Sequence, residues 1–169
     1  MLRVGTVGTS SIMRTIQEAI RLTDGMECRV VYSRTEEQGR AFAAEMGVPE
    51  HCTDYAAMLE RSDLDLIDIA SPNRFHAEQG LAALEHGKHV IVEKPAAVTR
   101  GDVQRLIDAA RANGVYFFEA ITTLFMPQYE ACRLLLPKLG RIEQAHITYA
   151  QYSSRYDAYL RGENPNIFN

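Results

Sequence analysis

The chain is poor in the features that mark secreted, membrane and nucleic-acid-binding proteins. Its three cysteines, Cys28, Cys52 and Cys132, are far apart and odd in number, so they fit neither a disulfide framework nor the spacing of a zinc site. Reduced thiols in a cytoplasmic protein are therefore expected. No apolar run approaches the roughly 20 residues that span a bilayer. The chain starts directly in a strand-like run, without the layout of a signal peptide.

Charge and composition narrow the class further. The formal net charge is -4, and charges of both signs are scattered along the 169 residues without a basic patch. Nucleic acid is therefore not an expected partner, and no set of metal ligands is predicted. A hydrophobic content of 46% allows a sizeable core. The length suits one full domain plus part of another.

Strand-like and helix-like patterns alternate over residues 1–121. Apolar runs bounded by turn formers predict strands, and apolar residues at helical spacing between them predict helices. The predicted strands are 2–7, 28–32, 64–70, 90–92 and 115–118, and the predicted helices are 11–22, 35–46, 54–61, 73–86 and 99–113. Asp65 and Asp68 interrupt the third apolar run. This alternation predicts an α/β domain, a Rossmann-type doubly wound parallel sheet with right-handed crossovers.

Three of the predicted helices start at residues that suit an N-cap. Thr35 and Asn73 each precede a helical pattern, and Thr99 is followed three residues later by Asp102. Short polar side chains at these positions accept hydrogen bonds from free N–H groups of the first turn. For Asn73, a capping role is a sufficient structural explanation.

Residues 122–169 read as the incomplete start of a second, α+β domain. The pattern predicts a helix over 127–136, one long strand over 142–152, and polar turns over 153–169. One strand with no later partner is not a stable unit. The alternatives are that it adds to a sheet edge or pairs with a second chain, so a homo-oligomer formed through this strand is expected.

The turn after the first strand resembles a phosphate-binding turn. The fingerprint Gly-x-Gly-x-x-Gly/Ala falls here on Gly8, Ser10 and Met13. Ser10 replaces the glycine that permits close backbone approach, and its hydroxyl could donate to a phosphate oxygen instead. The start of the helix would supply N–H groups and a positive dipole end. An ordinary strand–helix turn is the alternative. The residues expected to contact a dinucleotide are Gly8, Thr9, Ser10, Ser11 and Ile12.

The tip of the second strand favours NADP(H) over NAD(H). An NAD site expects a carboxylate about 20 residues beyond the glycines, but this strand ends in Ser33 and Arg34. Arg34 could hold a 2′-phosphate through a forked, charge-assisted contact. In the alternative interpretation Arg34 is a solvated loop residue and Glu36 or Glu37 contacts the ribose.

Two further strand tips carry candidate site residues. Ligands bind outside the carboxyl ends of an open parallel sheet, which is where Ser71-Pro72-Asn73 and Glu93-Lys94-Pro95 fall. His76 lies three residues after Asn73, and a lone histidine there is more often packed or capping than catalytic. Glu93 and Lys94 could equally be a surface pair that ends a strand.

Taken together, these motifs resemble the Gfo/Idh/MocA family of NAD(P)-dependent oxidoreductases. The resemblance covers essentially the whole chain and rests on Val7-Gly8-Thr9-Ser10, Tyr32-Ser33-Arg34, Ala70-Ser71-Pro72-Asn73 with His76, Gly87-Lys88-His89-Val90, Glu93-Lys94-Pro95, and Phe118-Glu119-Ala120. The segments 120–123 and 151–157 are similar to the branch of trans-dihydrodiol and sugar dehydrogenases.

The resemblance implies a two-domain enzyme whose first domain binds the nicotinamide cofactor. It implies that Lys94 lies near the nicotinamide and the substrate hydroxyl as the catalytic residue, and that Glu93 helps to position it. Around the cofactor it implies Ser71, Pro72, Asn73, His76 and Glu119. The acid–base histidine of many members lies beyond the equivalent of Asn169, and members commonly form dimers or tetramers.

Two functional hypotheses follow. In the first, the chain is the cofactor-binding portion of an NADP(H)-dependent oxidoreductase that moves a hydride to or from a hydroxyl or carbonyl carbon of a sugar, polyol or diol, with Lys94 polarising or deprotonating the oxygen. In the second, it is a truncated nucleotide-binding or interaction module without turnover of its own. A truncated piece of an ordinary enzyme is a third possibility.

Overall fold

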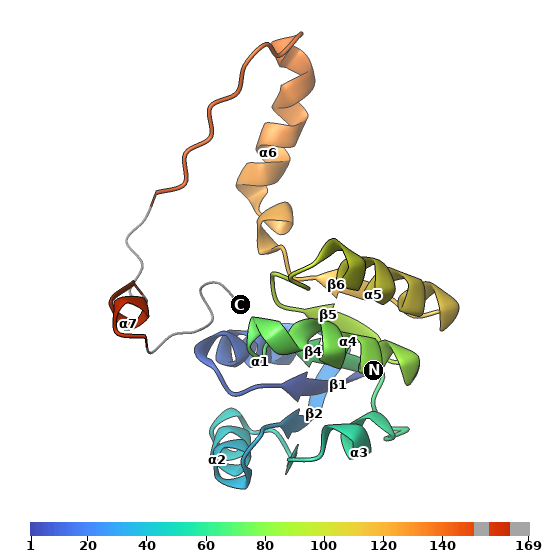
Figure 1. Ribbon diagram of the computed structural model, residues 1–169. Helices are drawn as coiled ribbons and strands as arrows, with labels where there is room; N and C mark the ends of the chain where they lie inside the picture. The colour runs from blue at the N-terminus through green and yellow to red at the C-terminus, as the bar shows by residue number, and fades with distance from the viewer. Residues whose placement is uncertain (151–155, 163–169) are drawn as a thin grey trace. The chain divides into compact units, whose positions relative to one another are not determined.

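The computed structural model describes residues 1–150 and 156–162. The chain divides into two compact units, Met1–Ala120 and Ile121–Asn169. The first unit contains a six-stranded sheet in the order β3-β2-β1-β4-β5-β6, and every pairing in it is parallel (Figure 1). Its strands are β1 Leu2–Val7, β2 Met26–Tyr32, β3 Glu50–Cys52, β4 Leu66–Ile69, β5 His89–Val92 and β6 Phe117–Glu119. The predicted Rossmann-type α/β fold is confirmed. Its strand order reverses direction between β1 and β4, where such sheets bind ligands.

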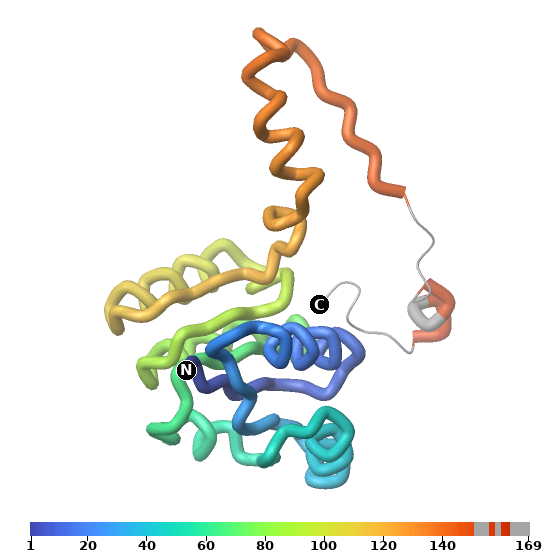
Figure 2. Tube along the Cα trace, turned by 180° about the vertical axis from the view of Figure 1, so that it is seen from behind, coloured from blue at the N-terminus to red at the C-terminus, as the bar shows by residue number. Residues whose placement is uncertain are grey.

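Helices cover both faces of this sheet. They are α1 Ser11–Leu22, α2 Glu36–Met46, α3 Tyr55–Leu59, α4 His76–Glu85 and α5 Arg100–Ala112. On one face, Met13 of α1 and Phe42 of α2 pack with Val31. On the other face, α3, α4 and α5 bury Met58, Leu84 and Leu106 against β1, β2, β4 and β5. Figure 1 shows α4 in front of the sheet, and the view from behind in Figure 2 brings α1 forward.

Two predicted helix caps differ from the structure. The Thr99 hydroxyl accepts the N–H of Asp102 at 3.1 Å, as predicted. Thr35 precedes α2 but makes no capping hydrogen bond through its side chain. The prediction that Asn73 caps a helix was wrong, because Asn73 is the first residue of the 3₁₀ turn η1 Asn73–Phe75, which leads into α4. A residue inside the turn cannot serve as the residue before it.

Three strand predictions also needed correction. The sequence pattern did not predict β3, which is three residues long and carries the polar pair Glu50 and His51. β2 begins at Met26 rather than Cys28, and β6 spans Phe117–Glu119 rather than 115–118. Val115 instead donates its N–H to the carbonyl of Ala110 in α5, so it closes the turn that follows that helix.

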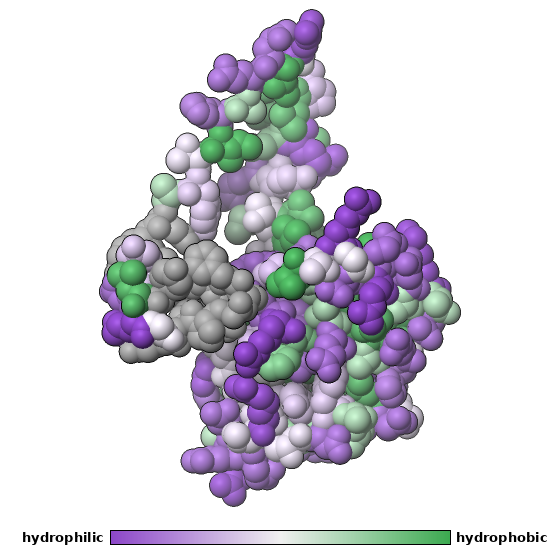
Figure 3. All heavy atoms as spheres, viewed as in Figure 1, coloured by the Kyte–Doolittle hydropathy of each residue, from purple (hydrophilic) through white to green (hydrophobic). Residues whose placement is uncertain are grey.

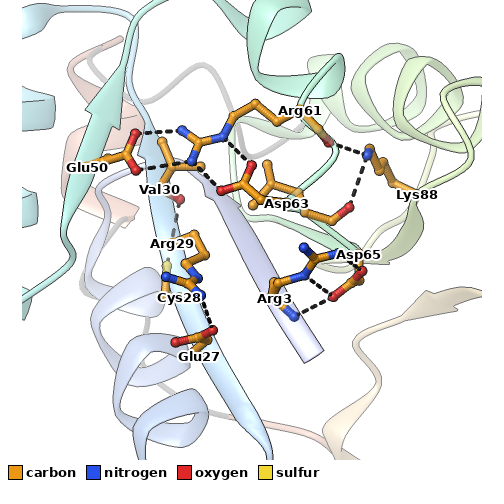
Figure 4. A network of polar contacts seen from close by, with 11 residues as sticks. Arg3, Glu27, Cys28, Arg29, Val30, Glu50, Arg61, Asp63, Asp65 and Lys88 are labelled. Atoms are coloured by element: carbon orange, nitrogen blue, oxygen red, sulfur yellow. Dashed lines mark hydrogen bonds and ion pairs between the residues drawn. The ribbon is translucent and has the colours of Figure 1, made fainter. Parts of the chain in front are cut away.

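A polar network ties together the amino ends of β1, β4 and β5 (Figure 4). The Arg3 guanidinium donates to both carboxylate oxygens of Asp65, at 2.9 and 2.6 Å, and holds the pKa of that carboxyl well below its usual range. The buried Lys88 ammonium donates to the carbonyls of Arg61 and Leu64, at 2.6 and 3.0 Å. Asp65, which interrupts an apolar run in the sequence, therefore serves the structure at the edge opposite the candidate site.

In the part of the second unit that the structure describes, the regular elements are all helical. They are η2 Thr122–Phe125, α6 Pro127–Leu135, η3 Leu136–Leu139 and α7 Tyr156–Leu160. The helix predicted over 127–136 is confirmed, and α7 lies where only turns were expected. The predicted strand over 142–152 was wrong for residues 142–150, which form no strand; residues 151 and 152 lie outside the described part. A strand needs a neighbour to complete its hydrogen bonds, so the association predicted through this segment stays a prediction.

Apolar side chains of the second unit are exposed to a large extent. Figure 3 shows hydrophobic residues gathered along α6 and the turns beside it. The exposed ones include Leu124, Phe125, Met126, Leu134, Leu135, Leu136 and Leu139. Among the described residues, no helix is long and apolar enough to cross a bilayer.

Candidate functional site at the carboxyl edge of the sheet

Gly8 directly follows β1 in a conformation that would strain a larger residue there. Its φ angle is +112°, and a Cβ atom added to it would lie 2.8 Å from the carbonyl oxygen of Ala70. Its N–H donates to the Tyr32 carbonyl of β2 at 3.0 Å. Gly8 thus lets the first turn pass close to the ends of two neighbouring strands.

The start of α1 presents N–H groups beside this turn that have no hydrogen-bond partner among the described residues. Ser10 precedes the helix in an extended conformation, with φ at −76°, and its hydroxyl makes no capping hydrogen bond. The first N–H groups of a helix have no partner within the helix, and such groups bind anions. Ser10 therefore fits the second glycine position without strain. Met13, at the third position, is fully buried and fills the core between α1, α2 and the sheet.

Two adjoining pockets lie along this edge. The first, of about 240 Å³, is lined by Val7, Gly8, Thr9, Ser10, Tyr32, Ser33, Arg34, Gln38, Ala70, Ser71, Pro72, Phe75 and Gln79. The second, of about 300 Å³, is lined by Tyr32, Arg34, Tyr55, Phe75, Glu78, Gln79 and Ala82. Four residues are common to both, so the two pockets share a wall at the switch point of the sheet, and together they are called the cleft.

Arg34 supplies a free positive charge to this cleft. Its side chain is exposed, and within the part of the chain that the structure describes no group bonds its guanidinium. Ser33 beside it is buried at the end of β2. Glu36, an alternative ribose contact, has its carboxylate 2.7 Å from Nε2 of His51. The tip of β2 therefore carries an unpaired guanidinium. Of the two acidic residues that follow it, Glu36 and Glu37, the first already contacts His51.

The loop after β4 is held by α4. The Ser71 hydroxyl donates to Oε1 of Gln79 at 2.6 Å. His76 is only 1% exposed; its Nε2 lies 2.7 Å from the Ser71 carbonyl oxygen and its Nδ1 lies 2.8 Å from that of Pro95. His76 lies beneath the loop and does not line the cleft.

Lys94 follows β5 at the same edge. It is exposed, and its ammonium has no hydrogen bond or ion pair among the described residues. The Lys94–Pro95 peptide bond is cis. The next N–H, that of Ala96, donates to Oε1 of Glu119 at 2.8 Å. Glu119 thus contacts the loop that carries Lys94.

Asp68, in the middle of β4, carries a buried carboxyl to which the sequence pattern assigned no role. It is 6% exposed, and its Oδ1 has no hydrogen-bond partner among the described residues. Burial and, to a smaller extent, the nearby Glu93 carboxylate raise the pKa of Asp68 to about 7. In the register of the sheet Asp68 lies beside Ile91, which places it and Glu93 on one face.

The structure brings part of the predicted set together. The predicted residues that line the cleft are Gly8, Thr9, Ser10, Ser33, Arg34, Ser71 and Pro72. The predicted residues that do not are Ser11, Ile12, Asn73, His76, Glu93, Lys94 and Glu119. Sequence reasoning missed Tyr32, Gln38, Phe75 and Gln79. Phe75 and Gln79 are four residues apart at the start of a helix, which places them on one helical face.

Comparisons with known proteins agree with this geometry. The profile of the Gfo/Idh/MocA oxidoreductase family, NAD-binding Rossmann fold, matches residues 2–121. The chain is 41% identical over 169 residues to the uncharacterized oxidoreductase YgjR of Escherichia coli K12, covering all of this chain and 52% of that protein. It is 36% identical over 168 residues to scyllo-inositol 2-dehydrogenase (NADP(+)) IolU of Bacillus subtilis 168, covering 99% and 51%.

A solved relative has a similar fold. The 3-ketoreductase KijD10 of Actinomadura kijaniata, in complex with NADP and TDP-benzene, superimposes with a TM-score of 0.76 at 31% identity, over 81% of this chain and 42% of the other. The chain spans about half the length of the curated relatives it matches. Because the family profile covers most of the chain and the sheet has the matching topology, the chain belongs to the Gfo/Idh/MocA family of oxidoreductases.

Proposed function

We propose that the chain binds NADP(H) in the cleft at the carboxyl edge of its sheet, as the cofactor-binding portion of an oxidoreductase. The N–H groups at the start of α1 would hold the pyrophosphate. Ser33 and Arg34 would hold the 2′-phosphate of the adenosine ribose, and Pro72 and Phe75 would line the adenosine. The residues present fit the cofactor, because a glycine with φ at +112° makes the tight turn before α1 and the hydroxyl of Ser10 at the start of that helix makes no capping hydrogen bond, which leaves its first N–H groups to an anion.

The observation that carries the choice of NADP(H) is the unpaired guanidinium of Arg34. It stands at the tip of β2 in the wall of the cleft, where an NAD site would have a carboxylate. Glu36, one of the alternative ribose contacts, pairs with His51 instead. The relatives IolU and KijD10 are described with NADP, which supports the same choice.

The reaction we infer is hydride transfer to or from a carbon that bears a hydroxyl or carbonyl, on a sugar, polyol or diol. When bound, the nicotinamide supplies or accepts the hydride. Lys94 would polarise the substrate oxygen or take its proton, since it is exposed at the same edge with a free ammonium. Inositol and sugar substrates appear in the names of the relatives, which supports this class.

Substitution of Arg34 tests the proposal. We expect the purified chain to bind NADPH more tightly than NADH, measured by fluorescence titration at fixed salt. R34A removes a charge-assisted contact with the 2′-phosphate, so NADPH affinity should fall roughly 10- to 100-fold. NADH affinity should change less than about threefold, because NADH has no 2′-phosphate.

R40A is the matched control, since Arg40 is an exposed arginine of α2 outside the cleft. It should leave both affinities unchanged. If R34A and R40A lose the same NADPH affinity, Arg34 contributes only through the net charge of the protein and not through a contact with the 2′-phosphate. Absence of saturable binding of either nucleotide by the unaltered chain would overturn the proposed function.

A further inference from the structure

One peptide group, between Pro95 and Ala96, is fixed from both sides directly after Lys94. Its carbonyl oxygen lies 2.8 Å from Nδ1 of His76, at the start of α4. Its N–H donates to Oε1 of Glu119, at the end of β6, at 2.8 Å. Because a peptide group is planar and stiff, two hydrogen bonds in opposite directions fix its orientation.

The same histidine reaches the cofactor loop. His76 Nε2 lies 2.7 Å from the carbonyl oxygen of Ser71, whose side chain lines the cleft. A carbonyl oxygen only accepts, so a hydrogen bond at either contact is donated by a ring N–H. His76 is therefore the bridge between the loop after β4 and the loop after β5.

The two hydrogen bonds of the clamp differ in burial. His76 is 1% exposed and Ala96 is 3% exposed, so water does not compete freely for the His76 side of the peptide group, whereas Glu119 is exposed and its carboxylate meets water. Lys94 itself is exposed and has no polar partner among the described residues. The peptide group that follows Lys94 is thus held by neighbours on two elements, α4 and β6, while the side chain of Lys94 stays free to meet a ligand.

We propose that His76 and Glu119 are positioning residues, which set the direction of Lys94 by clamping the Pro95–Ala96 peptide and which link that peptide to the cofactor loop through Ser71. Neither residue touches the reacting atoms. The inference rests on the proposed function for the role of Lys94, whereas the clamp itself exists without cofactor. A movement of the loop after β4, which contains Ser71, would then be transmitted to the loop that carries Lys94 through the side chain of His76.

Two substitutions of His76, by asparagine and by glutamine, allow its contacts with Pro95 and with Ser71 to be tested separately. The amide of asparagine has its NH₂ group near the position of Nδ1, and the amide of glutamine has it near Nε2. H76N therefore keeps the donor to Pro95 and loses the link to Ser71, whereas H76Q does the reverse. E119Q keeps an acceptor for Ala96, and E119A removes it. H86N is the matched control, because His86 lies at the other end of α4 and its Nδ1 is 2.7 Å from the Ala82 carbonyl oxygen.

The first measurement is hydrogen exchange at the Ala96 amide in the cofactor-free chain. We expect exchange to rise about tenfold in H76Q and E119A, and to stay near that of the unaltered chain in H76N, E119Q and H86N. Thermal unfolding shows which variants are folded, and the Glu119 pair carries the test if H76Q does not fold. Equal exchange in E119A and E119Q, or in H76N and H76Q, would overturn the clamp.

The second measurement is the rate at which acetic anhydride modifies Lys94, read by mass spectrometry with and without saturating NADP⁺. Lys138, in the second unit, is the internal reference. We expect NADP⁺ to protect Lys94 in the unaltered chain and in H76N, and to protect it several-fold less in H76Q and E119A. Equal protection in all variants would refute the positioning role while leaving the proposed function intact. If NADP⁺ protects Lys94 neither in the unaltered chain nor in any variant, the proposed function fails. The hydrogen-exchange rates at Ala96 still show in that case whether the clamp exists.

Discussion

The buried carboxyl of Asp68 makes the stability of this fold depend on pH. Its pKa is raised to about 7 by burial and by Glu93, whereas in the unfolded chain it would be about 3.9. Between these values the folded protein keeps a proton that the unfolded chain has lost. Stability therefore falls as pH rises from about 4 to about 7, and it levels off above that range.

We expect D68N to remove this pH dependence. An asparagine has no proton to lose, so the variant should match the original protein near pH 4 and exceed it at pH 8 by up to about 4 kcal/mol. Urea unfolding at pH 4, 6 and 8 measures the difference. D63N is the control: its carboxyl is paired with Arg61, which lowers the pKa of Asp63 to about 2. D63N should cost stability about equally at pH 6 and 8. Parallel pH profiles for D68N and the original protein would contradict the assignment.

At this scale the sequence predicted only part of the site. Gly8, Ser33 and Arg34 were identifiable because a turn glycine and the chemistry at a strand tip are local features. The roles of His76 and Glu119 were not, since both depend on one peptide group of a distant loop. Residue types and spacing carry no information about which carbonyl a ring nitrogen meets.

At the scale of elements, α2 and α5 both follow a threonine in the sequence but differ in whether that threonine caps the helix. Thr99 and Thr35 each precede a helix, but only the Thr99 side chain accepts a hydrogen bond from the first turn. We expect T99A to lower the free energy of unfolding by about 1 kcal/mol, and T35A to lower it by clearly less. Urea unfolding of both variants checks this, with T99S as the variant that keeps the cap. Equal losses in T99A and T35A would show that the hydrogen bond from Asp102 to Thr99 contributes nothing to stability.

The elements that sequence predicted well are those whose burial is regular. β1 is buried over Val4–Val7. The helices α1 and α5 bury residues at helical spacing, which are Met13, Gln17 and Ile20 in α1 and Leu106 and Ala110 in α5. β3 has three residues at the edge of the sheet, and its pairing with β2 rather than any apolar pattern defines it. Residues 142–150 show the opposite error: alternating side chains suggested a strand, but alternation alone provides no neighbouring strand.

At the scale of the whole molecule, the two units contribute unequally to the core. Every member of the three buried apolar clusters lies in Met1–Ala120. Among the described residues of Ile121–Asn169, all those whose side chains are described are exposed. The cleft residues also belong to the first unit. The first unit therefore holds both the apolar burial that stabilises a fold and the proposed cofactor site.

We therefore expect residues 1–120 to fold alone as a cooperative domain and to bind NADPH with an affinity within about threefold of that of the full chain. Circular dichroism during thermal unfolding and NADPH fluorescence test the two statements on the same sample. R34A made in the shortened protein is the internal control, since it should weaken NADPH as it does in the full chain. A shortened protein that unfolds without a cooperative transition would show that Ile121–Asn169 supplies stability that its exposed side chains do not account for. A folded one that binds no NADPH, beside a full chain that does, would place part of the cofactor site after Ala120.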